Sequence, residues 1–173
     1  MANIQIVTLT PEEWPLYKQI RLESLLMAPE AFSSSYAEVL QWPDSHWQER
    51  LVEARSREKS YLLFAKENER IVGIIGAYGP KGSEVVEIIS VYVTQEKRGQ
   101  GVGIALMTEI LEEVGKGKSF RKAVLTVNDG QIAAIALYRH FGFQTVGKIT
   151  GIMGDGNSHT GYVMEKYLVQ SIK

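Results

Sequence analysis

The sequence predicts a mixed α/β fold built around one central sheet. Its β-rich runs come first, a helical pattern follows with apolar residues at positions 106, 107, 110, 111 and 114, and further strand patterns end the chain. Strands, one crossover helix and then more strands are typical of a mixed sheet. Because no repeat, low-complexity tract or change of composition marks a boundary, residues 1–173 are expected to form a single domain.

The first third of the chain is predicted to carry a short strand and two helices. Residues 4–9 have a strand pattern. Residues 10–13, TPEE, combine a cap, a proline and a returning glutamate, so a helix is expected to begin there and to end before Pro29. A second helix is expected after residues 43–44, and residues 29–36, PEAFSSSY, are expected to be irregular.

The middle of the chain predicts a hairpin and a central strand. Residues 61–65 and 71–78 are β-rich and flank the polar residues 67–69, and residues 79–82 form the next turn signal. Residues 85–93, VVEIISVYV, are mostly β-branched. This composition predicts a central strand that is buried on much of both faces.

The last third predicts two more helices and three strands. Gly115 and Gly117 are expected to close the helix that contains the apolar repeat. A strand at residues 123–127 and a helix at residues 132–141 follow. The closing strands are expected at residues 143–150 and 162–168, joined by the glycine-rich loop GIMGDGNSH.

Charge and composition narrow the partners. Lysine and arginine (19) nearly balance aspartate and glutamate (20), so we expect neither nucleic acid nor a membrane as partner. The chain has no cysteine, which rules out disulfides, thiolate metal sites and a cysteine-linked acyl intermediate. The N-terminus lacks a signal-peptide pattern and no apolar run reaches membrane-spanning length, so a cytoplasmic protein is expected.

The stretch RGQGVG, residues 98–103, places glycines between a strand and a helix, as phosphate-binding turns do. A P-loop is rejected because Gly117-Lys118-Ser119 has Glu112 in its first-glycine position. A dinucleotide-binding turn is rejected because the third glycine comes one residue early, which leaves Ile104 in its place.

The stretch fits the form R-x-x-G-x-G, and residues 133–143, AAIALYRHFGF, fit the form A-x-x-L-Y-x-x-x-G-F. With both motifs, the region from about residue 87 to residue 143 resembles the GNAT superfamily of acetyl-CoA-dependent N-acyltransferases. The resemblance implies a twisted, mostly antiparallel sheet of about six or seven strands with about four helices. It also implies acetyl transfer from acetyl-CoA to a primary amine; the alternative is a non-catalytic acyl-CoA-binding sensor or interaction module.

The glycine turn is the predicted pyrophosphate site. Backbone N–H groups at a helix N-terminus suit a pyrophosphate, and an arginine adds positive charge, whereas the alternative is that the glycines only permit close packing. By resemblance, freed backbone groups of residues 91–93 would bind pantetheine; the alternative is an ordinary, fully paired strand. The predicted cofactor-binding residues are Val91, Tyr92, Val93, Arg98, Gly99, Gln100, Gly101, Val102, Gly103 and Gln131. Gln131 stands where the family commonly has asparagine, and Asn128 is the possible substitute.

Two residues are candidates for the chemistry. Tyr138 resembles the family's general acid, since a phenol with a pKa near ~10 can protonate a thiolate; the alternative is a packed tyrosine. Glu87 is the candidate base because burial in an apolar strand would raise its pKa, although a solvent-facing glutamate or a water chain is equally open. Without cysteine, direct attack in a ternary complex is favoured.

The remaining expectations concern metal, acceptor and assembly. The three histidines have no ligand spacing, so no metal is expected. The segments PEAFSSSY and GIMGDGNSH are expected to build the acceptor side, where Asp155 is a candidate partner for the amine and a turn former otherwise. The acceptor, a small-molecule or peptide amine, and a possible homodimer are left open.

Overall fold

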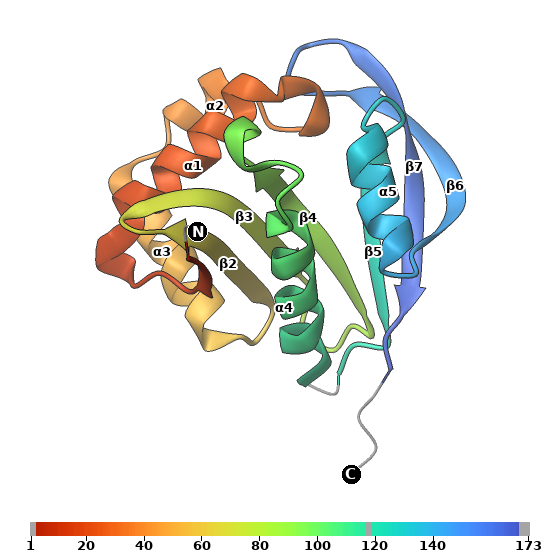
Figure 1. Ribbon diagram of the computed structural model, residues 1–173, viewed down its shortest axis with the longest axis horizontal. Coiled ribbons are helices and arrows are strands. Elements are labelled where there is room, and N and C mark those ends of the chain that lie inside the picture. The colour runs from red at the N-terminus through yellow and green to blue at the C-terminus, as the bar shows by residue number, and fades with distance from the viewer. Residues whose placement is uncertain (1–2, 117–118, 170–173) are drawn as a thin grey trace.

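The computed structural model describes residues 3–116 and 119–169, and Figure 1 shows their arrangement. They form a seven-stranded sheet in the order β1-β2-β3-β4-β5-β7-β6. Neighbouring strands are antiparallel, except that β4 and β5 run parallel. The predicted mixed, mostly antiparallel sheet is therefore confirmed.

The strands and helices follow one another much as predicted. The strands are β1 (Ile4–Val7), β2 (Ser60–Glu67), β3 (Arg70–Tyr78), β4 (Val85–Val93), β5 (Lys122–Asn128), β6 (Gln144–Ile152) and β7 (Ser158–Tyr167). The α-helices are α1 (Trp14–Met27), α2 (Tyr36–Leu40), α3 (Asp44–Ser56), α4 (Val102–Lys116) and α5 (Ile132–His140). Short 3₁₀ turns are η1 (Pro11–Glu13), η2 (Pro29–Ala31) and η3 (Gln95–Lys97).

Local side-chain caps explain the N-terminal elements. The Glu13 carboxylate accepts a hydrogen bond from the Thr10 amide at 2.8 Å, which is one half of the predicted capping box. The predicted irregular segment instead contains η2 and the start of α2, where the Ser35 hydroxyl accepts from the Glu38 amide at 3.2 Å. This short, serine-capped helix is the additional element beyond the expected number.

Hydrophobic cores lie on both faces of the sheet. On one face, α4 and α5 pack over side chains such as Leu63, Ile75 and Val86. On the other face, α1, α2 and α3 cover Phe64, Ile74 and their neighbours. Because successive strand residues point to opposite faces, the continuous apolar runs of β2 and β3 supply both cores at once.

Strand β4 lies in the middle of the sheet, as predicted, but it is less buried than expected. Its burial alternates, and Ile89 to Val91 are only half-buried. A β-bulge in the pairing with β3 places Ser90 at φ +57°, in the left-handed region. The prediction that β4 is buried on much of both faces is therefore wrong, because part of the strand lines a cavity.

The two ends of the predicted C-terminal region also differ from expectation. The GIMGDGNSH segment is strand at both of its ends, since β6 runs to Ile152 and β7 begins at Ser158. Gly115 lies inside α4 instead of ending it, and Gly117 and Lys118 lie outside the described residues.

Gly161 sets how closely β7 approaches β5, and its replacement by alanine is expected to destabilise the fold. A Cβ atom there would lie 2.5 Å from the Val127 carbonyl oxygen, a backbone atom that cannot rotate away. We expect a loss of about 1–3 kcal/mol, measured by thermal unfolding. Gly151→Ala in the neighbouring strand is the matched control, because a Cβ there meets nothing within 4 Å. Equal melting temperatures for both variants would contradict the prediction.

Candidate functional site

The sheet opens between its parallel strands. β4 and β5 pair from Val85 to Glu87 on β4 and from Lys122 to Val124 on β5, and beyond these residues they diverge, as Figure 1 shows. The opening leads into a cavity of about 560 Å³ that both strands line. A cavity of this size matches the volume of small-molecule sites.

On the closed side of β4, the backbone of Tyr92 is directed at β3. The Thr94 amide donates to the Val72 carbonyl at 2.9 Å, and Tyr92, two residues earlier, pairs with Ile74. Residues two apart on a strand direct their backbone groups to the same side. The expectation that Tyr92 offers free backbone groups is therefore wrong. Its side chain is buried, and burial raises the pKa of the hydroxyl to about 12.

Val91 and Val93 stand in the opposite phase, so their backbone groups are directed at the open side of β4. The Val93 carbonyl accepts a hydrogen bond from Nε of Arg98 at 3.0 Å. The same guanidinium lies 5.7 Å from the centre of the Tyr92 ring. Arg98 thus packs along the end of β4, beside the glycine turn.

The turn between β4 and α4 holds its glycines for different reasons. Gly99 and Gly101 have φ values of +72° and +84°, which favour glycine, and nothing lies within 4 Å of a Cβ at either position. Gly103 instead approaches α5, since its Cβ would lie 3.3 Å from the Leu137 side chain. The packing explanation therefore accounts for Gly103 but leaves Gly99 and Gly101 as an open turn.

The first turn of α4 presents its amides at this open surface. The Ala105 amide donates to the Gly101 carbonyl at 3.0 Å, which begins the helical pattern, so the amides before it have no intrahelical partner. The Gln100 side chain turns back to the Glu96 carbonyl at 2.8 Å. Open N–H groups at a helix N-terminus are the arrangement that binds phosphate.

Tyr138 lies on α5 and lines the cavity from the face that α4 and α5 cover. It is 6% exposed, and its ring packs against Phe143 with centroids 6.2 Å apart. Burial raises the pKa of its hydroxyl well above the usual range of tyrosine. No group among the described residues hydrogen-bonds this hydroxyl, so it can donate a proton to a ligand in the cavity.

Glu87 reaches the same cavity at the last residue of the parallel pairing. Its neighbours Val86 and Ile88 belong to the core under α4 and α5, so strand alternation directs Glu87 to the face of α1 and α3. Glu87 is exposed, so the burial expected for it is absent. Its solvated carboxylate lines the cavity on the opposite face of the sheet from Tyr138.

Gln131 and Asn128 are both engaged with the η2 segment. The Asn128 side-chain amide donates to the Glu30 carbonyl at 3.1 Å, and its oxygen accepts from the Gly130 amide at 2.8 Å. Nε2 of Gln131 donates to the Glu30 carboxylate at 3.1 Å. Both side chains line the cavity, and Asn128 is the more fully committed to structure.

The two expected acceptor loops meet at the cavity mouth. The Gly154 amide donates to the Phe32 carbonyl at 2.7 Å, and both segments contribute lining residues. The Asp155 carboxylate forms contacts within its own turn: it accepts a hydrogen bond from the Asn157 amide and contacts Nε2 of His159 at 2.7 Å. These contacts lower the pKa of Asp155, and they favour its role as a turn former.

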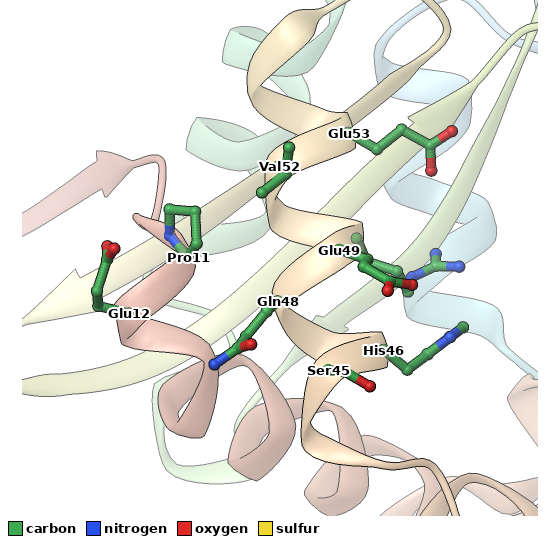
Figure 2. A pocket seen from close by; sticks show the side chains of 9 residues that line it. Pro11, Glu12, Ser45, His46, Gln48, Glu49, Val52 and Glu53 are labelled. Carbon is green, nitrogen blue, oxygen red and sulfur yellow. The ribbon is translucent and has the colours of Figure 1, made fainter.

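A second pocket, of about 760 Å³, lies away from the opening and is shown in Figure 2. Its lining comes from η1 and from one side of α3, including Glu12, His46 and Glu53. It reaches neither the glycine turn nor Tyr138, so the cavity between β4 and β5 is the candidate site.

Two further observations concern metals and membranes. Within residues 3–116 and 119–169, no group of three or more histidine, aspartate or glutamate side chains is placed to hold a metal ion. None of the helices in this part of the chain combines the length and apolar character needed to span a bilayer.

Sequence reasoning missed part of the cavity. Tyr17, Arg21 and Arg50 line it, and so does Trp42, although these residues lie on α1, on α3 and between helices. These residues form no sequence motif, and only the packing of α1 against α3 brings them together. The presence of an arginine on the apolar face of each helix was the sequence signal that could have indicated a site there.

Comparison with solved structures shows the fold. An acetyltransferase of the GNAT family from Streptococcus pneumoniae has a TM-score of 0.82 over 96% of this chain and 100% of its own, at 18% identity. The YncA protein of Salmonella typhimurium, solved with its cofactor acetyl-CoA, has a TM-score of 0.80 over 99% of this chain and 98% of its own, also at 18% identity. The chain therefore has the fold of these two proteins.

Sequence comparison gives the family. The model of the acetyltransferase (GNAT) family matches residues 19–143, and the chain belongs to this family. N-acetyltransferase 8B of Rattus norvegicus is 31% identical over 101 residues, which cover 52% of this chain and 45% of that protein. The chain thus matches less than half the length of this relative. The predicted family is confirmed.

Proposed function

We propose that this protein transfers the acetyl group of acetyl-CoA directly to a primary amine in a ternary complex. The observation that carries the proposal is the opening between β4 and β5, which Tyr138 and Glu87 line from opposite faces of the sheet. An amine and a thioester that meet in this opening would find a base on one side and an acid on the other. The sensor alternative is not favoured, because the matched relative is an N-acetyltransferase.

The donor would lie along the open edge of β4. The backbone groups of Val91 and Val93 would bind the pantetheine arm, and the turn of residues 98–103 would bind the pyrophosphate. This placement is supported by the phase of the strand and by the unpaired amides at the start of α4. Gln131 and not Asn128 would contact the cofactor, because Asn128 already uses both ends of its amide.

The chemistry would proceed in one step of acyl transfer. Glu87, directly or through water, would take a proton from the ammonium group, and the neutral amine would attack the thioester carbonyl. The carbon–sulfur bond would then break, and Tyr138 would donate its proton to the leaving thiolate. The nitrogen would lose its second proton as the amide forms, and this proton would pass through water to return Tyr138 to its neutral form. A single domain over the whole chain, a cytoplasmic location and a homodimer stay predictions.

Acetyl-CoA is expected to raise the melting temperature, whereas ATP and NAD are not. At a concentration of about one hundred times Kd, a ligand adds about 2.7 kcal/mol to the free energy of unfolding. This corresponds to a rise in melting temperature of roughly 5–10 °C for a domain of this size. Differential scanning fluorimetry measures the shift. An equal shift with a nucleotide that lacks pantetheine would reject the placement of the donor.

Release of CoA in the presence of a broad library of primary amines tests the complete reaction. We expect turnover with at least one class of amine, and initial-rate lines that intersect, as direct attack in a ternary complex requires. Parallel lines would indicate an acyl-enzyme and reject the direct mechanism. Binding of acetyl-CoA without turnover across the library would favour the sensor.

A further inference from the structure

The wall of the cavity on the face of α1 and α3 carries two arginines. Arg21 on α1 and Arg50 on α3 both line it, together with Tyr17. Glu87 is directed to this same face of the sheet. The arginines therefore lie on the side from which the proposed base would act, which is the acceptor side.

Aromatic side chains hold both guanidinium groups in place. The guanidinium carbon of Arg21 lies 4.7 Å from the centre of the Phe32 ring, and that of Arg50 lies 5.9 Å from Trp42. Nε of Arg50 also donates to the Tyr17 hydroxyl at 3.0 Å. Phe32, Trp42 and Tyr17 line the cavity, so the charged groups are held at its surface by stacking and by a neutral partner.

Neither arginine has an acidic partner within the described ranges. No carboxylate oxygen lies within 4.0 Å of either guanidinium there. Two acids on neighbouring segments are engaged elsewhere, since Glu23 accepts from Tyr92 and Glu30 accepts from Gln131. Burial lowers the pKa of Arg21 most; Tyr17 opposes this shift, and the nearby charge of Arg50 adds to it. An anionic ligand would stabilise the desolvated guanidinium of Arg21.

We propose that the acceptor amine also carries a carboxylate, and that Arg21 and Arg50 bind this carboxylate. The proposal rests on the proposed acetyl transfer to an amine. Guanidinium groups bind carboxylates through paired, charge-assisted hydrogen bonds, and the terminal nitrogens of Arg50 have no hydrogen-bond partner among the described residues. Glu87 supplies negative charge to the same cavity, so its lining complements a molecule with an ammonium group and a carboxylate. Free amino acids have this chemistry.

The first test compares amino acids with their amides as acceptors, because each pair differs in the carboxylate. Loss of the carboxylate also lowers the pKa of the α-amine, so rates are compared per neutral amine over a range of pH. CoA release is measured for a panel of L-amino acids and for the matching L-amino acid amides. We expect the best amino acid to exceed its amide about 10- to 100-fold in kcat/KM, as charge-assisted hydrogen bonds require. Equal or faster turnover of the amides would overturn the proposal.

Variants of the arginines assign the effect to these residues. Arg21→Gln and Arg50→Gln are expected to raise KM for the amino acid about tenfold or more, with a smaller change in kcat, and to bring the acid-to-amide ratio toward one. Arg21→Lys keeps the charge and should retain part of the preference. Arg55→Gln, on the exposed side of α3, is the matched control and should leave the ratio unchanged. A ratio that survives both glutamine variants would overturn the assignment.

Binding of the acetylated product separates this proposal from the acetyl transfer itself. N-acetyl-L-amino acids and their amides need no turnover, and their effect on the melting temperature is measured with CoA present. We expect stabilisation by the acids and not by the amides, lost in both glutamine variants that still bind CoA. If no amine is acetylated, the proposed reaction fails, and this measurement still decides whether the arginines form a carboxylate site.

Discussion

Tyr138→Phe is expected to lower kcat about 100- to 10,000-fold, the range that general acid catalysis contributes. The thiolate of CoA must gain a proton as it leaves, and the Tyr138 hydroxyl is buried at the cavity wall without a partner in the described part of the chain. Because the hydroxyl has no hydrogen bond to lose there, the variant should fold and should bind acetyl-CoA with nearly unchanged Kd. Stopped-time measurement of CoA release, with calorimetry for Kd, separates the two effects.

Tyr61→Phe is the matched control for that variant. Tyr61 is also 6% exposed, but its hydroxyl donates to the Arg57 carbonyl and it does not line the cavity. Its replacement should leave kcat unchanged. Since burial raises the pKa of Tyr138, the hydroxyl stays protonated above the ordinary tyrosine value of about 10, so kcat should not fall on the alkaline side below that pH. Full activity of Tyr138→Phe would remove this residue from the mechanism.

Glu87→Gln is expected to lower kcat/KM about 100-fold near neutral pH, because the acceptor must lose a proton before it attacks. The amide has the same shape and cannot accept that proton. The rate of the variant should then rise with pH until the amine deprotonates in solution. A pH profile of kcat/KM for both proteins measures the recovery.

Glu84→Gln provides the comparison, since Glu84 lies just before β4, pairs with Arg121 and does not line the cavity. It should behave as the unmodified protein does. If Glu87→Gln keeps the activity of the parent at neutral pH, the proton passes through water without help from this carboxylate. That outcome would leave the role of Tyr138 intact, because the acid and the base act on different atoms.

Local sequence patterns predicted most of the fold. The β-branched run of β4 and the glycines before α4 specify their own elements, because propensity and backbone freedom act over a few residues. The serine-capped helix α2 was missed because its five residues carry less signal than the irregular segment before it. The length of the β6–β7 hairpin was missed because its many glycines suggested a loop.

The proposed donor side could be named from the sequence, and the proposed acceptor side could not. The turn at residues 98–103 and Tyr138 lie within short motifs that resemble those of the GNAT family, and this resemblance implied their roles. The sequence could not predict which backbone groups of β4 face the opening, because the bulge at Ser90 changes this alternation. Arg21 and Arg50 belong to separate helices, and only tertiary packing places both at one cavity.

The hydrogen bonds between the η2 segment and the second half of the chain connect the two sides of the cavity at a second place. At one end, β4 and β5 are tied by their short parallel ladder. At the other end, Glu30 and Phe32 tie the N-terminal helices to Asn128, Gln131 and Gly154. The second set of contacts joins residues that lie 98 and 101 positions apart in the chain, so the N-terminal helices and the C-terminal part of the sheet are held to each other at the cavity that both line.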